Sequence, residues 1–232
     1  MKKLLSPFDS SALQLKNHVV MAPMTRSRAI NNIPNDLMVT YYKQRSGAGL
    51  IITEGTAPTP EALGYPRIPG AFSEEQVTGW KAVTDAVHKN GSKIFLQLMH
   101  TGRIAHIANL PLGYQPVGMS DIKAAGQIFT DSQGPQDHSV PVALDTEGIA
   151  AVIEGFVNAA KNAVRAGFDG VELHGANGYL LEQSLNPHIN NRTDNYGGSI
   201  ENRSRLIIDI AEKISFAIGS EKVGLRISPF ST

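Results

Sequence analysis

Five short apolar runs rich in β-forming residues, separated by segments with helical periodicity, constrain the fold of this chain more than any other feature. Because a strand and a following helix usually form a right-handed crossover to a parallel strand, this alternation predicts a parallel sheet. Two architectures meet that requirement, a doubly wound sheet and a β/α barrel. The predicted strands are 19–23, 50–54, 94–99, 170–174 and 223–228.

Each intervening helix begins and ends at recognisable signals. Ser73 and Gln76 have the spacing of a capping box at the start of an apolar stripe that ends at Gly91. Another stripe runs from Ile149 to Gly167. The four predicted helices are 35–46, 73–91, 149–167 and 199–219.

Two long insertions favour the barrel over the doubly wound sheet. Residues 101–145, after the third strand, and 187–198, after the fourth, are rich in Gly, Pro, Asn and Asp, and barrel enzymes build their sites from loops at this end of the strands. The Gly-x-Gly-x-x-Gly motif of dinucleotide-binding folds is missing between the first strand and its helix. We therefore predict an α/β fold of the TIM (β/α)8 barrel family, to which residues 1–232 contribute one domain of about five strands and four helices.

Composition excludes several classes of function. The chain has 21 Lys plus Arg and 21 Asp plus Glu, so it lacks the basic surplus that nucleic acids or anionic membranes require of a partner. It has no cysteine, which excludes disulfides, thiolate metal sites and cysteine nucleophiles, so redox chemistry would need a bound organic cofactor. Without a signal-like or spanning apolar run, we expect a cytoplasmic protein.

Polar side chains gather where the predicted strands end. Alternation along the strands places Glu172 and His174 on one face, with Val171, Leu173, Leu225 and Ile227 on the other, toward the helices. Glu172 is also expected to form a buried ion pair with Arg226. Because these strand ends converge in a barrel, they predict a site. Its candidate residues are Thr25, Glu54, Thr56, Gln97, His100, His174, Asn177 and Arg226.

The residue types at these strand ends indicate a chemistry. His174 and Asn177 offer neutral hydrogen-bond donors, and Tyr179 offers a phenol as a proton source, which suits a carbonyl oxygen that becomes negative as an enolate forms. Gln97 and Arg226 could hydrogen-bond a flat heterocycle with carbonyl and imide edges, with Thr25 at its rim.

Four segments also carry a resemblance to a known family. They are 22–26 (APMTR), 97–103 (QLMHTGR), 172–181 (ELHGANGYLL) and 190–203 (NNRTDNYGGSIENR). With these segments the chain resembles the old yellow enzymes, FMN-dependent ene-reductases, from about Leu4 to Ser228, and Thr25 with residues 102–104 (GRI) is similar to the branch of N-ethylmaleimide reductase. Two departures are Met99, where many relatives have Trp, and Asn177, which is His in some.

The resemblance implies a role for each matching position. Non-covalent FMN would contact Pro23, Met24, Thr25 and the backbone around Ala57, with Gln97 at its pyrimidine edge and Arg226 beside N1. His174 and Asn177 would bind the oxygen of an activated alkene such as an enone, maleimide or nitro compound, or of a phenolic ligand. Tyr179 would protonate carbon, and NADPH would be the reductant.

The strand count implies an incomplete barrel, because a closed one needs eight strands and places its phosphate site after strands seven and eight. We expect a missing C-terminal half or a complementing chain, without which the 232 residues would be poorly soluble or flavin-free. Two alternatives stay open: an inactive fragment or scaffold protein, and a metal-dependent barrel hydrolase. The hydrolase would use Glu54, His100, Glu172 and His174.

Overall fold

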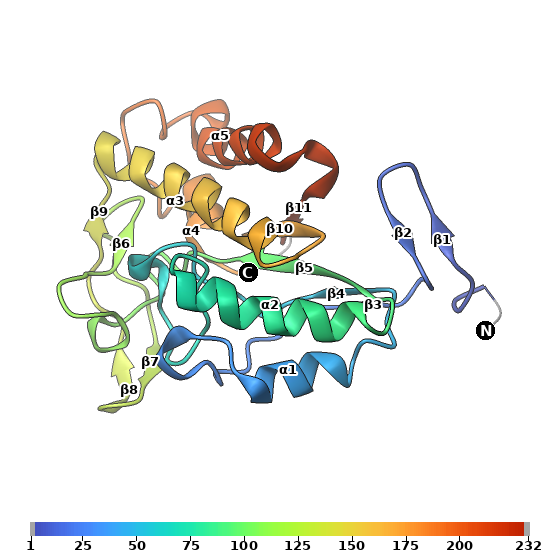
Figure 1. Ribbon diagram of the computed structural model, residues 1–232. Coiled ribbons are helices and arrows are strands. Elements are labelled where there is room, and N and C mark those ends of the chain that lie inside the picture. Colours follow the sequence, from blue (N-terminus) through green and yellow to red (C-terminus); the bar gives the residue numbers. More distant parts are fainter. Residues whose placement is uncertain (1–2, 230–232) are drawn as a thin grey trace.

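A five-stranded parallel sheet forms the centre of the computed structural model, which describes residues 3–229 (Figure 1). Each strand pairs with its predecessor in the chain, so the strand order shows no reversal. A doubly wound sheet would reverse its order at a switch point, whereas a barrel adds strands in sequence. The predicted barrel-type fold is therefore confirmed, as an open partial barrel. Its strands are β3 (Val20–Met21), β4 (Leu50–Ile52), β5 (Lys93–Leu98), β10 (Gly170–Gly175) and β11 (Val223–Ile227).

The four predicted helices cover one face of this sheet. They follow one another in chain order, α1 packing on α2, α2 on α3 and α3 on α5 (Figure 1). Side chains from the sheet, including Ile51, Leu96 and Val171, are fully buried against Trp80 and Phe156 from this layer. The helices are α1 (Asp36–Lys43), α2 (Glu74–His88), α3 (Thr146–Arg165) and α5 (Ile200–Ile218).

The start of α2 has the predicted capping box. The Ser73 hydroxyl accepts a hydrogen bond from the Gln76 backbone N–H, and the Gln76 side chain accepts one from the Ser73 backbone N–H. These bonds satisfy donors that the first turn of a helix otherwise leaves free. At the end of α3, Gly167 has a φ of 89°, a left-handed conformation that favours glycine.

The chain between β5 and α3 forms a small layer at the carboxyl ends of the sheet strands (Figure 1). It contains η3 (Ile107–Asn109), a parallel pair β6 (Val117–Gly118) with β9 (Val142–Ala143), and an antiparallel pair β7 (Gln127–Thr130) with β8 (Gly134–Asp137). The hairpin β1 (Phe8–Asp9) and β2 (Gln14–Leu15) lies toward the opposite end. Short helices complete the fold: η1 (Ile30–Asn32), η2 (Pro60–Ala62), η4 (Ser220–Lys222) and α4 (Leu180–Leu185), the last of which the sequence did not predict.

The outer face of β11, the last strand of the sheet, is more exposed than the sequence predicted. Leu225 and Ile227 on β11 are 47% and 58% exposed, although alternation predicted that they would face helices. The reason is that α5 packs mainly against α3 and α4, so the helices of residues 3–229 leave the outer face of β11 largely uncovered. No helix in the described range combines the length and the apolar character needed to cross a membrane.

Candidate active site

Four polar residues lie together on the sheet face that points away from the helices. Gln97 on β5 is in register with Glu172 on β10, and His174 is in register with Arg226 on β11. The Gln97 carboxamide Nε2 donates to Glu172 Oε1 at 2.8 Å. Three adjacent strands therefore bring together the residues that the sequence predicted on one face.

Glu172 is bound differently from the prediction. Among the ion pairs of residues 3–229, none joins Glu172 to Arg226, so the expected buried ion pair is wrong and Gln97 is the partner instead. Burial raises the pKa of the Glu172 carboxyl, opposed by the Gln97 hydrogen bond and the Arg226 charge. Arg226 consequently keeps its guanidinium free of a salt bridge within the described part of the chain.

His174 is a neutral imidazole at the end of β10. Burial, and secondly the positive charge of Arg226, lower the pKa of His174 to about 4. The residue is 5% exposed, and its Nδ1 has no hydrogen-bond partner among residues 3–229. Since an unpaired buried polar atom is costly, this nitrogen marks a position where a ligand group would be stabilised.

Tyr179 contacts His174 through its ring and Tyr65 through its hydroxyl. The His174 and Tyr179 rings meet edge-on at a centroid distance of 4.9 Å. The Tyr179 hydroxyl lies 3.1 Å from the hydroxyl of Tyr65, a residue that the sequence analysis missed. Tyr65 follows β4 and η2 in the loop leading to α2, where no periodicity marks it. Its position after a strand end was the one signal that could have found it.

The turn that carries Asn177 is fixed by backbone hydrogen bonds. Asn177 has a φ of 58°, a left-handed conformation that Asn tolerates, and its N–H donates to Ser228 Oγ at 2.9 Å. Ser228 Oγ donates to Glu182, which also accepts from the Gly178 N–H. The Asn177 side chain itself is exposed, which leaves its amide available to a ligand.

The other predicted flavin contacts occupy two places. Pro23, Met24 and Thr25 follow β3 at the far edge of the sheet, two strands away from β5, and Thr25 is exposed. Ala57 is buried beside Met99 and Tyr179. Its N–H donates to the Pro69 carbonyl and its own carbonyl accepts from the Ala71 N–H, so the Ala57 N–H is already used within the fold.

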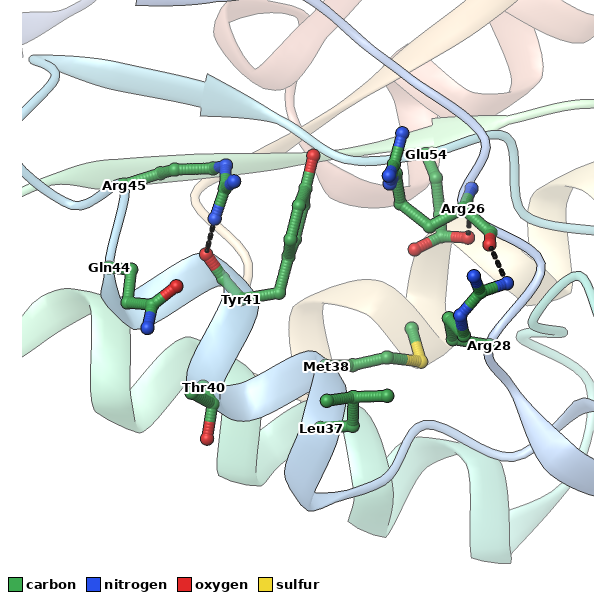
Figure 2. A pocket seen from close by; sticks show the side chains of 9 residues that line it. All are labelled: Arg26, Arg28, Leu37, Met38, Thr40, Tyr41, Gln44, Arg45 and Glu54. Atoms are coloured by element: carbon green, nitrogen blue, oxygen red, sulfur yellow. Dashed lines mark hydrogen bonds between the residues drawn. The ribbon is translucent and has the colours of Figure 1, made fainter.

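A separate pocket of about 270 Å³ lies on the helix side of the sheet, between α1 and the ends of β3 and β4 (Figure 2). The Tyr41 ring stands between two guanidinium groups, with Arg45 at 3.7 Å and Arg26 at 5.6 Å from its centroid. The rest of the polar lining is Arg28, Thr40, Gln44 and the buried Glu54. Gln97, His174, Asn177, Tyr179 and Arg226 do not line this pocket, so it is distinct from the predicted site.

The residues proposed for a metal-dependent hydrolase do not converge. Glu54 accepts hydrogen bonds from the Arg26 N–H and the Tyr42 hydroxyl on the α1 side, and burial raises its pKa. His100 is buried, which lowers its pKa to about 3, and its Nδ1 accepts from the Gly102 N–H. Within residues 3–229, no three His, Cys, Asp or Glu side chains are grouped so that they could hold a metal ion. The hydrolase alternative therefore has no support in the side-chain geometry.

Comparison with known proteins identifies the family. The model of the NADH:flavin oxidoreductase / NADH oxidase family matches residues 3–232. The chain belongs to this family. The matched range includes Gln97, Glu172, Arg226 and the turn from His174 to Tyr179.

Individual relatives agree with the family match. The chain is 43% identical to 12-oxophytodienoate reductase 1 of Oryza sativa subsp. japonica over 98% of its own length and 59% of that protein. It superimposes on morphinone reductase with a TM-score of 0.93 and 44% identity, covering 98% of this chain and 62% of that one. The old yellow enzyme homologue of Zymomonas mobilis gives a TM-score of 0.93 at 41% identity, covering 98% and 63%. The predicted resemblance to old yellow enzymes is confirmed, and the chain spans about three fifths of the length of these relatives.

The donor set at the strand ends fits a flavin. A flavin pyrimidine edge presents carbonyl oxygens and an N–H, and a carboxamide such as that of Gln97 can both donate and accept. The Arg226 guanidinium, which forms no ion pair within residues 3–229, suits a group that becomes anionic on reduction. The buried, unpartnered Nδ1 of His174 adds a position for a further polar atom.

Proposed function

We propose that this chain provides the substrate-facing part of an FMN-dependent oxidoreductase that reduces activated alkenes such as enones, maleimides and nitroalkenes. The observation that supports this most directly is the neutral, buried His174 with an unpartnered nitrogen, in ring contact with Tyr179 at the carboxyl end of β10. That arrangement offers a polar contact and a proton source side by side. Membership of the NADH:flavin oxidoreductase / NADH oxidase family supports flavin as the cofactor.

Gln97 and Arg226 would hold non-covalent FMN, together with Pro23, Met24, Thr25 and the backbone around Ala57. When bound and reduced, FMN would supply a hydride. Arg226 would place its positive charge where the reduced ring carries negative charge, and Glu172 would orient the Gln97 carboxamide through their 2.8 Å hydrogen bond.

His174 and Asn177 would bind the carbonyl or nitro oxygen of the alkene. As the oxygen gains negative charge, donors already aimed at it stabilise the charge without reorganising, which is the basis of oxyanion stabilisation. The fixed turn of Asn177 and the buried ring of His174 supply that preorganisation. Tyr179 would give its hydroxyl proton to the carbon next to the one that accepts hydride.

NADPH is the reductant that we propose, with NADH as the alternative that the experiment below distinguishes. A morphinone reductase structure contains tetrahydroNAD, which supports a nicotinamide cofactor. Because the relatives extend well beyond the matched part, we propose that activity also needs a segment that completes the sheet, on the same polypeptide or a complementing one. The 232-residue chain alone would then be inactive.

Cofactor release tests the flavin. The protein, with a completing segment from a relative supplied where needed, is purified and heated, and the released cofactor is identified by chromatography. We expect FMN. FAD, or no flavin after reconstitution of the completed protein, would overturn the proposal.

Stopped-flow kinetics test the role of Tyr179. In Tyr179→Phe we expect flavin reduction by NADPH or NADH to stay near the wild-type rate, because the phenol acts only on the alkene. Reoxidation by 2-cyclohexenone should slow by about 10²–10⁴, the usual cost of removing a general acid. Equal slowing of both half-reactions would contradict the assigned role, and the wild-type traces compare the two reductants.

A further inference from the structure

Tyr65 and Tyr179 form a hydroxyl pair that the proposed reaction does not yet use. Their hydroxyl oxygens lie 3.1 Å apart, and their rings stand at 89° with centroids 6.2 Å apart. Both side chains are half-buried and pack on the small apolar cluster around Ala57, Leu63 and Met99. The pair therefore belongs to a packed part of the fold that limits how far either hydroxyl can move.

One hydrogen bond joins the two hydroxyls, and its direction decides what Tyr179 can do. If Tyr179 donates to Tyr65, its proton lies between the two oxygens and points away from a substrate. If Tyr65 donates, the Tyr179 proton is free to point elsewhere. Either hydroxyl can donate while both are neutral. Burial raises the pKa of Tyr65, with the neighbouring Tyr179 adding to the effect, so Tyr65 keeps its proton and is able to donate when Tyr179 Oη becomes negative.

We propose that Tyr65 is a positioning residue whose hydroxyl donates to Tyr179 Oη and so directs the Tyr179 proton toward the substrate carbon. This inference rests on the proposed ene-reductase function. In the step itself, the Tyr179 O–H bond breaks and a C–H bond forms at the carbanionic carbon left by hydride addition. The negative charge moves to Tyr179 Oη, and water later returns a proton to it.

The Tyr65 hydrogen bond gains strength during this transfer. A hydrogen bond to an ionised oxygen is shorter and about twice as strong as one between neutral groups, so the bond from Tyr65 stabilises the phenolate more than the phenol. Tyr65 keeps its own proton throughout. Within residues 3–229, the cation–ring contacts involve Tyr41 and not Tyr179, and His174 beside Tyr179 is neutral near pH 7.

Tyr65→Phe tests the proposal, because it keeps the ring and removes only the hydroxyl. In the flavin-loaded protein we expect reoxidation at saturating 2-cyclohexenone to slow by about tenfold to a hundredfold, the range for losing a hydrogen bond to a charged group. Flavin reduction by the nicotinamide cofactor and the KM for the enone should stay within about twofold. Tyr114→Phe, which alters an exposed tyrosine in the insertion, is the matched control and should match wild type.

A double variant and a spectroscopic measurement complete the test. Tyr65→Phe should add no slowing to Tyr179→Phe, because Tyr65 acts only through the Tyr179 hydroxyl. In protein labelled with ¹³Cζ-tyrosine, the Tyr179 resonance should shift in Tyr65→Phe and not in Tyr114→Phe. The inference would be overturned if the double variant reoxidised more slowly than Tyr179→Phe alone. It would also be overturned if the Tyr179 resonance did not shift in Tyr65→Phe. Wild-type protein that holds flavin but fails to reduce any enone would instead overturn the proposed function.

Discussion

The neutral imidazole of His174 determines which ligands the site can stabilise. A protonated His174 would attract anions of any shape, whereas the neutral ring offers one N–H and one lone pair, so it selects by hydrogen-bond geometry. Because the pKa of His174 lies at about 4, this neutral form persists across the physiological range. The protonation state of the residue therefore comes from its position at the end of a buried strand.

Removing the His174 ring should weaken two classes of ligand together. A phenolate stacked on flavin presents its oxygen where the enolate oxygen would form, so we expect His174→Ala to lose affinity for p-hydroxybenzaldehyde as well as catalytic efficiency with enones. Losing one such donor costs about 2.7–4 kcal/mol in transition-state stabilisation. Titration of the flavin absorbance measures the phenol, and Asn177→Ala should behave similarly. Unchanged phenol affinity in both variants would mean that the oxygen site lies elsewhere.

His100 should make the free energy of unfolding depend on pH. Its folded-state pKa of about 3 lies below the ordinary value of 6.5, so the unfolded chain binds the extra proton first as pH falls. The free energy of unfolding should therefore decrease as pH falls from about 6.5 toward 3, and His100→Gln should decrease less over that range. Urea unfolding at several pH values measures this. His188→Gln, at an exposed histidine, is the control and should follow wild type.

At the residue scale, the sequence could predict side chains placed by strand alternation but not those placed by loops. Gln97, Glu172, His174 and Arg226 lie on short regular strands, where a period of two fixes the face. Tyr65 lies in an irregular loop, and only tertiary packing brings it to Tyr179. The Glu172 partner was mispredicted because the choice between a neutral amide and a cation depends on side-chain reach.

At the element scale, helices with strong end signals were predicted closely, and α4 was missed. The box at Ser73 and the stop at Gly91 bracket α2 because they satisfy backbone groups locally. The six-residue α4 is too short to show a period, and its N-cap residue, Tyr179, makes no side-chain capping bond.

The capping box at α2 should contribute measurably to stability. Ser73→Ala removes the acceptor for the Gln76 N–H, so we expect the free energy of unfolding to fall by about 0.5–2 kcal/mol. Thr78→Ala is the control, because that exposed hydroxyl only bonds back to the Glu74 carbonyl within the helix. Urea denaturation of both variants measures the difference. Equal changes in the two would show that the cap adds nothing beyond helix propensity.

At the scale of the whole molecule, the sheet built by residues 3–229 leaves its two edge strands, β3 and β11, each paired on one side. Val20 on β3 is 49% exposed, and Leu225 and Ile227 on β11 are similarly uncovered. Unpaired strand edges with apolar side chains are prone to pair with other chains. We therefore expect the 232-residue polypeptide to self-associate, as light scattering or sedimentation would show. Leu225→Lys with Ile227→Lys should reduce the association, whereas a monodisperse wild-type monomer would contradict the expectation.

The sequential strand order also affects the order in which the sheet can fold. Each sheet pairing closes one connection between neighbouring strands, so β3, β4 and β5 with α1 and α2 can assemble before β10 is made during synthesis. The connection from β5 to β10 is the longest, residues 99–169 against residues 22–49 for the first, a segment roughly 2.5 times as long. Loop entropy makes its closure only about 0.8 kcal/mol more costly. The long connection between β5 and β10 thus adds only modestly to the cost of pairing β10 with β5.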